Sequence, residues 1–211
     1  KYGSDEGSYK FVESVTLPTA AADWTDDATD GITTTKKLVA KLTNVDTKNQ
    51  YYVLVLLNNN KTGGVKVALP TVGQSYNEWN SQILRPSVDD LAADNDFYMA
   101  NAPLKGSASP TTLVTIDKEH IYSTKKKAEA GTSAATVYVE RGVAKMSVTD
   151  PTTKTVIDKA TNTPTQSTVE FNNWALDITN QKTYAVHNID GLSTDFSAIW
   201  TTARFTGINK R

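Results

Sequence analysis

Two histidines are the residues best suited to acid–base chemistry, and each lies near an aspartate in the sequence. Asp117 precedes His120 by three residues, and Asp190 follows His187 by three. Hydrolysis by a serine or threonine needs such a base beside the hydroxyl. The chain has no Gly-x-Ser-x-Gly motif and no cysteine, so it offers no recognisable nucleophile. We interpret both histidines as ordinary loop or strand-end residues, and we expect no enzymatic activity.

Acidic residues cluster at three places and raise the question of a cation site. Asp26–Gly31 partly imitates a calcium loop, but Ala28 occupies a ligand position and Lys37 stands where the bidentate glutamate belongs. Asp89–Asp90 and residues 94–96 offer further oxygen ligands for a surface cation. A glycosidase would need two carboxylates held about 5 to 10 Å apart, and the sequence does not show which acids meet. We expect solvated loops, with no metal and no cofactor.

Four tryptophans are candidates for stacking against a sugar ring. Trp79 and Trp174 each belong to an apolar pattern, which predicts that they lie in the core. Trp24 lies in a polar stretch, so we expect it to be the most exposed of them. Trp200 lies in a region without a clear pattern.

Strands are the elements that must position these residues. The clearest candidates alternate between apolar and polar residues or are apolar throughout, as strands are. In the first half they are residues 9–15, 37–42, 51–57 and 65–69, and in the second half residues 97–99, 113–116, 120–122, 136–148, 169–171, 174–177 and 184–186. Residues 19–31 are expected to form a loop. The Asn/Gly cluster at residues 58–64 predicts a hairpin between residues 51–57 and 65–69.

One short helix is predicted near residues 75–84. Ser75 and Glu78 have the spacing of a capping box, and Tyr76, Trp79 and Ile83 share one helical face. We expect that face to pack into the core, and Pro86 to lie beyond the helix end.

Two further local signals concern the second half of the chain. The basic run at residues 125–127 is interpreted as a solvated loop. Gly142 interrupts a long alternating stretch, which predicts a bulge or a close backbone approach there.

The composition limits the class of protein. The chain has 211 residues and a net charge of −1, from 22 basic and 23 acidic residues. This balance indicates no basic surface that would bind nucleic acid or an anionic membrane. The chain contains 31 threonines, and threonine favours strands. No apolar run approaches the roughly 20 residues of a membrane span. If the protein is exported, we expect its targeting segment to have been removed. Many strands joined by Thr/Asn/Gly loops predict an all-β sandwich.

Three stretches together resemble the fimbrillin superfamily of Bacteroidales, in particular its short (minor) fimbrial shaft type. They are residues 96–102 (DFYMANA), 137–146 (VYVERGVAKM) and 174–180 (WALDITN), the last followed by Lys182 and Tyr184. Their order and spacing carry the resemblance, which covers residues 38–184 and is weak at both ends.

The resemblance implies a transthyretin-like β-sandwich of Greek-key type. Residues 1–190 would form the N-terminal type of domain, and residues 191–211 a linker or the start of a following segment. It also implies export as a lipoprotein and cleavage by a protease specific for Arg or Lys, which removes the first strand. The missing lipid-bearing cysteine agrees with such a removal, and the length suits one domain of a two-domain subunit.

The function that the resemblance implies is that of a structural subunit of a cell-surface fimbria. Such subunits polymerise by donor-strand complementation with copies of themselves and with tip and anchor proteins. The location would be extracellular, on a fimbrium attached to the outer membrane of a Gram-negative bacterium. Host or bacterial surface receptors are further expected partners, and nucleic acid is not. The alternative is a surface glycan-binding adhesin module that does not polymerise.

Overall fold

Strands dominate the part of the chain that the computed structural model describes. The described residues are 6–30, 33–46, 48–60, 66–81, 97–106, 109–143, 153–170, 183–192 and 200–202. The chain divides into two compact units, Lys1–Val143 with Lys182–Arg211, and Ala144–Gln181. Small antiparallel sheets and a few short helices make up the described residues, so the predicted all-β class is confirmed. The boundary after residue 190 stays a prediction.

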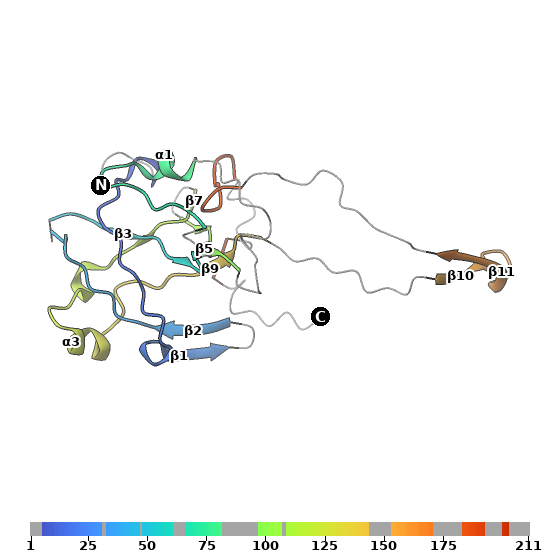
Figure 1. The fold of residues 1–211 in the computed structure, drawn as a ribbon, viewed down its shortest axis with the longest axis horizontal. Helices are drawn as coiled ribbons and strands as arrows, with labels where there is room; N and C mark the ends of the chain where they lie inside the picture. The colour runs from blue at the N-terminus through green and yellow to red at the C-terminus, as the bar shows by residue number, and fades with distance from the viewer. Residues whose placement is uncertain are drawn as a thin grey trace. The chain divides into compact units, whose positions relative to one another are not determined.

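The larger unit contains most of the elements (Figure 1). Its strands are β1 (Thr25–Asp30), β2 (Thr33–Lys37), β3 (Tyr52–Val53), β4 (Leu56–Leu57), β5 (Met99–Asn101), β6 (Leu104–Lys105), β7 (Pro110–Thr111), β8 (Val114–Thr115) and β9 (Val139–Arg141). Its helices are α1 (Tyr76–Asn80) and α3 (Lys125–Ala130), with single 3₁₀ turns η1 (Glu6–Ser8), η2 (Ala21–Asp23) and η4 (Lys118–His120). The smaller unit contains β10 (Thr153–Asp158) and β11 (Thr163–Glu170).

A three-stranded sheet lies at the centre of the larger unit. Its order is β4-β5-β9, with Ala100 of β5 opposite Leu56 on one side and Glu140 on the other. Three further pairs, β1-β2, β3-β8 and β6-β7, are antiparallel as well. The apolar run 51–57, predicted as one strand, therefore forms two short strands with different partners.

Asn101 bridges the point where that run changes partner. Its side chain accepts from Val55 N at 2.8 Å and donates to Val53 O at 3.0 Å and Thr112 O at 2.7 Å. Asn101 is 1% exposed. The backbone groups between β3 and β4 thus have a side chain as partner, because buried N–H and C=O groups need one.

The hairpin predicted between residues 51–57 and 65–69 is wrong for the described residues. Residues 66–69 form no strand, and β4 pairs with β5. Val67 is instead bonded at both backbone groups by Asn59, whose Oδ1 accepts from Val67 N at 2.8 Å and whose Nδ2 donates to Val67 O at 2.9 Å. Asn58 adopts φ of 54°, which turns the chain away from β4.

Several other local predictions are corrected. Residues 9–15 form only an isolated bridge between Lys10 and Ser75, and residues 38–42 and 121–122 lie outside strands. Residues 25–30 are a strand, where a loop was expected. The basic run is the start of α3, because the Thr124 side chain caps it by accepting from Lys127 N at 3.3 Å.

Residues 184–186 also form no strand, and the reason is the same as at Val67. Asn80 Oδ1 accepts from Val186 N at 2.8 Å, and Asn80 Nδ2 donates to Val186 O at 3.1 Å. An asparagine amide carries a donor and an acceptor as a peptide group does. At Asn59, Asn80 and Asn101 it therefore replaces a neighbouring strand.

The predicted helix and its buried face are confirmed. Ser75 caps α1 by accepting from Glu78 N at 3.2 Å. Trp79 is 2% exposed, and its Nε1 donates to Ala68 O at 2.7 Å. The helix ends at Asn80, and Ile83 and Pro86 lie outside the described residues.

The core of the larger unit gathers around Tyr98. It consists of Val67, Trp79, Tyr98, Ala100, Ala185 and Val186, with Leu54, Leu56, Tyr76 and Val143 packed against it. The Tyr98 hydroxyl donates to Ala185 O at 2.8 Å, and burial raises the pKa of this phenol. A Cβ atom on Gly142 would lie 3.0 Å from Tyr98 Cδ1, which confirms the close approach predicted at this glycine.

Asn101→Ala tests the role of the asparagines. We expect it to lower the free energy of unfolding by about 3 to 5 kcal/mol, because it removes the side-chain partner of three backbone groups, one of them buried and two partly buried. Chemical denaturation measures the change. The control is Asn77→Ala, an exposed residue of α1, expected to change stability by less than about 0.5 kcal/mol. Equal effects of the two substitutions would contradict the role assigned to Asn101.

Candidate functional site

The two histidines form carboxylate pairs that differ from each other. His120 Nδ1 lies 2.8 Å from Asp117 Oδ2 in the turn η4, as the spacing suggested. Asp117 also accepts from Glu119 N at 3.0 Å, so it caps the turn. Neither histidine is hydrogen-bonded to a serine or threonine hydroxyl among the described residues. The pair at η4 therefore has the geometry of a local turn.

His187 pairs with Glu140 of β9 instead of Asp190. Its Nδ1 lies 2.9 Å from Glu140 Oε1, and its ring meets Trp200 edge-on at 6.3 Å between centroids. Asp190 N donates to Asn188 Oδ1 at 3.0 Å. The structure thus joins three segments that are far apart in sequence at His187, a grouping that spacing alone could not reveal. Its chemistry is that of a structural contact.

The acidic clusters provide no cation site in the described residues. Asp26–Asp30 belong to β1 and pair with β2, so their backbone does not have the coil that a calcium loop requires. Residues 89–90 and 94–96 lie outside the description. Where the chain is described, no three His, Cys, Asp or Glu side chains group as metal ligands do.

The tryptophans lie mostly inside. Trp79 and Trp200 are buried, while Trp24 is half-buried instead of exposed. Trp24 Nε1 donates to Pro18 O at 2.7 Å, which fixes its indole against the preceding segment. Trp174 lies outside the described residues.

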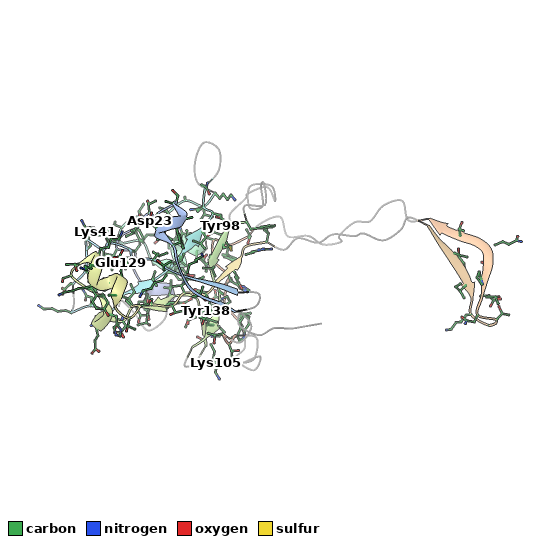
Figure 2. The ribbon with its side chains drawn as sticks, turned by 90° about the horizontal axis from the view of Figure 1, so that it is seen from below. Asp23, Lys41, Tyr98, Lys105, Glu129 and Tyr138 are labelled. Atoms are coloured by element: carbon green, nitrogen blue, oxygen red, sulfur yellow. The ribbon has the colours of Figure 1, made fainter. Side chains whose placement is uncertain are left out.

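A pocket of about 430 Å³ opens beside the Trp24 segment. Its lining comes from the segment before η2, from η2 itself, from β2 with the two residues after it, and from α3: Thr16, Pro18, Ala22, Asp23, Thr25, Lys37, Leu38, Val39, Lys125 and Glu129. Figure 2 labels Asp23 and Glu129, which come from two of these walls. This volume lies in the range of small-ligand sites.

Lys37 links two walls of the pocket, β2 and the end of α3, by hydrogen bonds. Its Nζ donates to Glu129 O at 3.1 Å and to Gly131 O at 2.8 Å, and so satisfies carbonyls at the end of α3. Lys125 Nζ lies 3.6 Å from Glu129 Oε1. The lining therefore combines charges of both signs and hydroxyl groups with apolar side chains, which suits a polar, neutral molecule.

The N-terminal segment, residues 6–13, is fastened at both ends by a glutamate. The Glu6 carboxylate accepts from Thr112 Oγ1 at 2.7 Å, from Thr112 N at 3.0 Å and from Leu113 N at 3.2 Å. The Glu13 carboxylate accepts from Thr43 Oγ1, from Thr43 N at 3.0 Å and from Asn44 N at 3.1 Å. Each glutamate thus binds a threonine hydroxyl and two successive backbone N–H groups.

Between these ends the segment pairs with the start of α1. Tyr76 N donates to Tyr9 O at 2.8 Å, and Phe11 N donates to Gln74 O at 2.9 Å. Tyr9 also stacks on Tyr52 at 4.4 Å between centroids. Val12, which is 37% exposed, and Val72, which is 77% exposed, leave apolar surface next to this pairing.

The edges of the sheets are the other places where a partner can bind. β4 pairs with β5 on one side, and no described strand lies on its other side. Leu56 and Leu57 of β4 are half-buried, and Leu56 packs against the core. An edge strand presents unpaired backbone groups to any chain that can add to it.

No family model, curated protein or solved structure matches this chain. No helix among the described residues is long and apolar enough to cross a membrane.

Glu13 makes the fastening of the N-terminal segment dependent on pH. The Thr43 hydroxyl lowers the pKa of Glu13 below its ordinary value of 4.5, with help from the N–H groups of Asn44 and Thr43 and against a smaller effect of burial. A carboxyl group whose pKa is lower in the folded chain than in the unfolded chain stabilises the fold at pH values above its unfolded pKa. This stabilisation is lost as the pH falls through the folded pKa. We expect Thr43→Val to raise the pKa of Glu13, measured by NMR titration of its carboxyl carbon.

The lowered pKa of Glu13 fixes the sign of the stability change that Glu13→Gln should cause. Glu13→Gln should lower the melting temperature at pH 7, and the difference from the parent chain should vanish once the pH is well below 4.5. Glu78→Gln, an exposed glutamate of α1, is the control. A difference for Glu13→Gln that is independent of pH would contradict the carboxylate's role.

Proposed function

We propose that this chain is a structural subunit of a cell-surface fimbria that polymerises by donor-strand complementation. The proposed fold is a transthyretin-like β-sandwich of the N-terminal fimbrillin type, spanning residues 1–190. The proposed role is non-catalytic, and the proposed place is outside the cell on a Gram-negative outer membrane. Further copies, tip and anchor proteins and an Arg/Lys-specific processing protease are the proposed partners, with surface receptors for adhesion.

The positions of two of the family-like stretches support this proposal. Residues 97–101 contain β5, and residues 137–143 contain β9. These strands are neighbours in the central sheet, with Met99 opposite Arg141 and Asn101 opposite Val139. Two of the three stretches that carry the resemblance thus contribute neighbouring strands to one sheet, as a shared fold would require. The third stretch, residues 174–180, lies outside the described residues.

The apolar edge at β4 is the observation that carries the proposal. A donor strand adds to such an edge through main-chain hydrogen bonds, and its alternate side chains fill pockets beside the core. β4 combines two leucines, contact with the core through Leu56, and no further strand on its outer side among the described residues. A polar edge strand would bind an added chain more weakly.

Added peptides test the proposal. We expect one or more peptides of about ten residues, with apolar and polar side chains in alternation, to raise the melting temperature by about 5 to 10 °C at 100 times the dissociation constant. Amide exchange should slow at Leu56–Leu57 when such a peptide binds. Peptides of equal composition with a period of three to four are the control.

The result that would overturn the proposal is specific. If peptides from every fimbrial donor strand tested left both the melting temperature and the exchange of β4 unchanged, strand donation at this edge would be abandoned. Stabilisation without slower exchange in β4 would place the acceptor edge elsewhere and contradict the assignment to β4.

The pocket beside Trp24 favours a second candidate function, a glycan-binding module that does not polymerise. Protein sites for sugars combine hydrogen-bonding groups with apolar or aromatic surface. Here Asp23, Lys125 and the threonines supply the polar groups, and Pro18, Leu38 and Val39 supply apolar surface.

A glycan array distinguishes the two candidates. If the pocket binds a glycan, binding should be saturable and should fall at least about tenfold in Asp23→Ala, a loss of about 1.4 kcal/mol. It should fall as much in Trp24→Ala, because the Trp24 indole is hydrogen-bonded to Pro18 of the pocket lining. The control is Lys41→Ala, since Lys41 is exposed and does not line the pocket. Glycan binding that neither Asp23→Ala nor Trp24→Ala weakens, or no glycan binding at all, would reject the pocket as a glycan site.

A further inference from the structure

The described part of the smaller unit is a hairpin whose two strands have different edges. β10 and β11 lie side by side (Figure 1) and pair antiparallel. Asp158 lies opposite Thr163 at the turn, and Ile157 lies opposite Pro164 next to it. Asp158 Oδ1 accepts from Ala160 N at 2.7 Å, and Asn162 adopts φ of 51°, so local chemistry closes the turn.

The described side chains of the hairpin are exposed to solvent. From residue 155 to residue 168 only Thr165 is half-buried, and Val156 and Ile157 are 37% and 49% exposed. The side chains extend from both sides of the ribbon (Figure 2). A two-stranded ribbon alone is at most marginally stable in water. One or more additional strands would give the ribbon the three or more strands that independent stability requires.

The backbone pattern identifies which edge can accept that strand. Val156 O accepts from Thr165 Oγ1 at 3.0 Å, so the carbonyl of Val156 faces β11. The register of the pair shifts between Thr155 and Ile157, where Val156 alone stands against residues 165–167, so the extra residues belong to β11. Along β10 itself the backbone groups alternate in direction, so those of Thr155 and Ile157 face its outer edge. Pro164, opposite Ile157, has no N–H to offer at the outer edge of β11. Among the residues that the structure describes, the open edge is therefore that of β10.

We propose that β10 pairs antiparallel with β10 of a second copy of this chain. The two hairpins then form a four-stranded sheet about a two-fold axis, with the same surface used by both copies. This contact is separate from strand donation at β4 and does not depend on it. In a fimbria it would join copies side by side.

Charge complementarity selects the register of the pair. With the axis at Val156, residue 154 (Lys) lies opposite residue 158 (Asp) of the second copy, and the reverse pair forms by symmetry. Val156 lies opposite itself, and the outward groups of Thr155 meet those of Ile157. Moving the axis to Thr155 or Ile157 would place each of these charges opposite an apolar or uncharged residue. Opposite charges across strands are favourable, and like charges are not.

A cysteine at the axis tests the register directly, because the chain has no cysteine of its own. In the proposed pair, residue 156 lies opposite its own copy in a non-hydrogen-bonded position, where Cβ separation suits a disulfide. We expect the full chain with Val156→Cys to form disulfide-linked dimers under mild oxidation at least about tenfold faster than Thr168→Cys, an exposed position on β11. Ile157→Cys should also be slow.

Charge reversal provides an independent test. Lys154→Asp should weaken the dimer at least about tenfold in sedimentation equilibrium, since two attractive pairs become repulsive. Lys154→Arg, which keeps the positive charge and leaves Asp158 in its turn, should leave the dimer unchanged. Equal cross-linking of the three cysteine variants, or a dimer that Lys154→Asp does not weaken, would overturn the proposal. A chain that stays monomeric at every concentration would overturn it as well, and none of these results bears on peptide binding at β4.

Discussion

Hydrogen bonds from buried asparagine side chains to the backbone are the interaction on which the larger unit depends. Asn59, Asn80 and Asn101 bond to Val67, Val186 and the backbone around Val55. These segments lie in or beside the core, where an unpaired N–H or C=O group is costly. Because the asparagines satisfy them, the chain needs no continuous strands through these points. The strands beside them are short, and the core still holds Tyr98 and Trp79.

The same constraint links the fold to the proposed functions. At the asparagine sites the backbone groups have side-chain partners, and a strand from another chain can add at the sheet borders. β4 offers an apolar border, and β10 offers a border next to exposed Val156 and Ile157. The first suits a strand donated by another subunit, and the second suits an identical strand. The two glutamates that fasten residues 6–13 act in the same way, since each takes up backbone N–H groups that no strand reaches.

Some local patterns in the sequence predicted local features correctly. The Ser75 cap, the buried face of α1 and the close approach at Gly142 depend on residues near one another or on the absence of a side chain. The breaks in the strands could not be predicted, because Asn59 and Asn101 act on backbone whose position only the fold determines. β1 and β10 were missed because they lack the alternating apolar pattern by which strands are recognised. The contact between His187 and Glu140 could not be predicted, because Glu140 is distant in sequence.

Residue-resolved amide hydrogen exchange on the purified chain tests the central claim most directly. If asparagine side chains replace strands, the amides of Val55, Val67 and Val186 should exchange as slowly as those of β5, although none of the three lies in a strand. Exchange of these amides at the rate of exposed loops, with β5 still protected, would contradict the account.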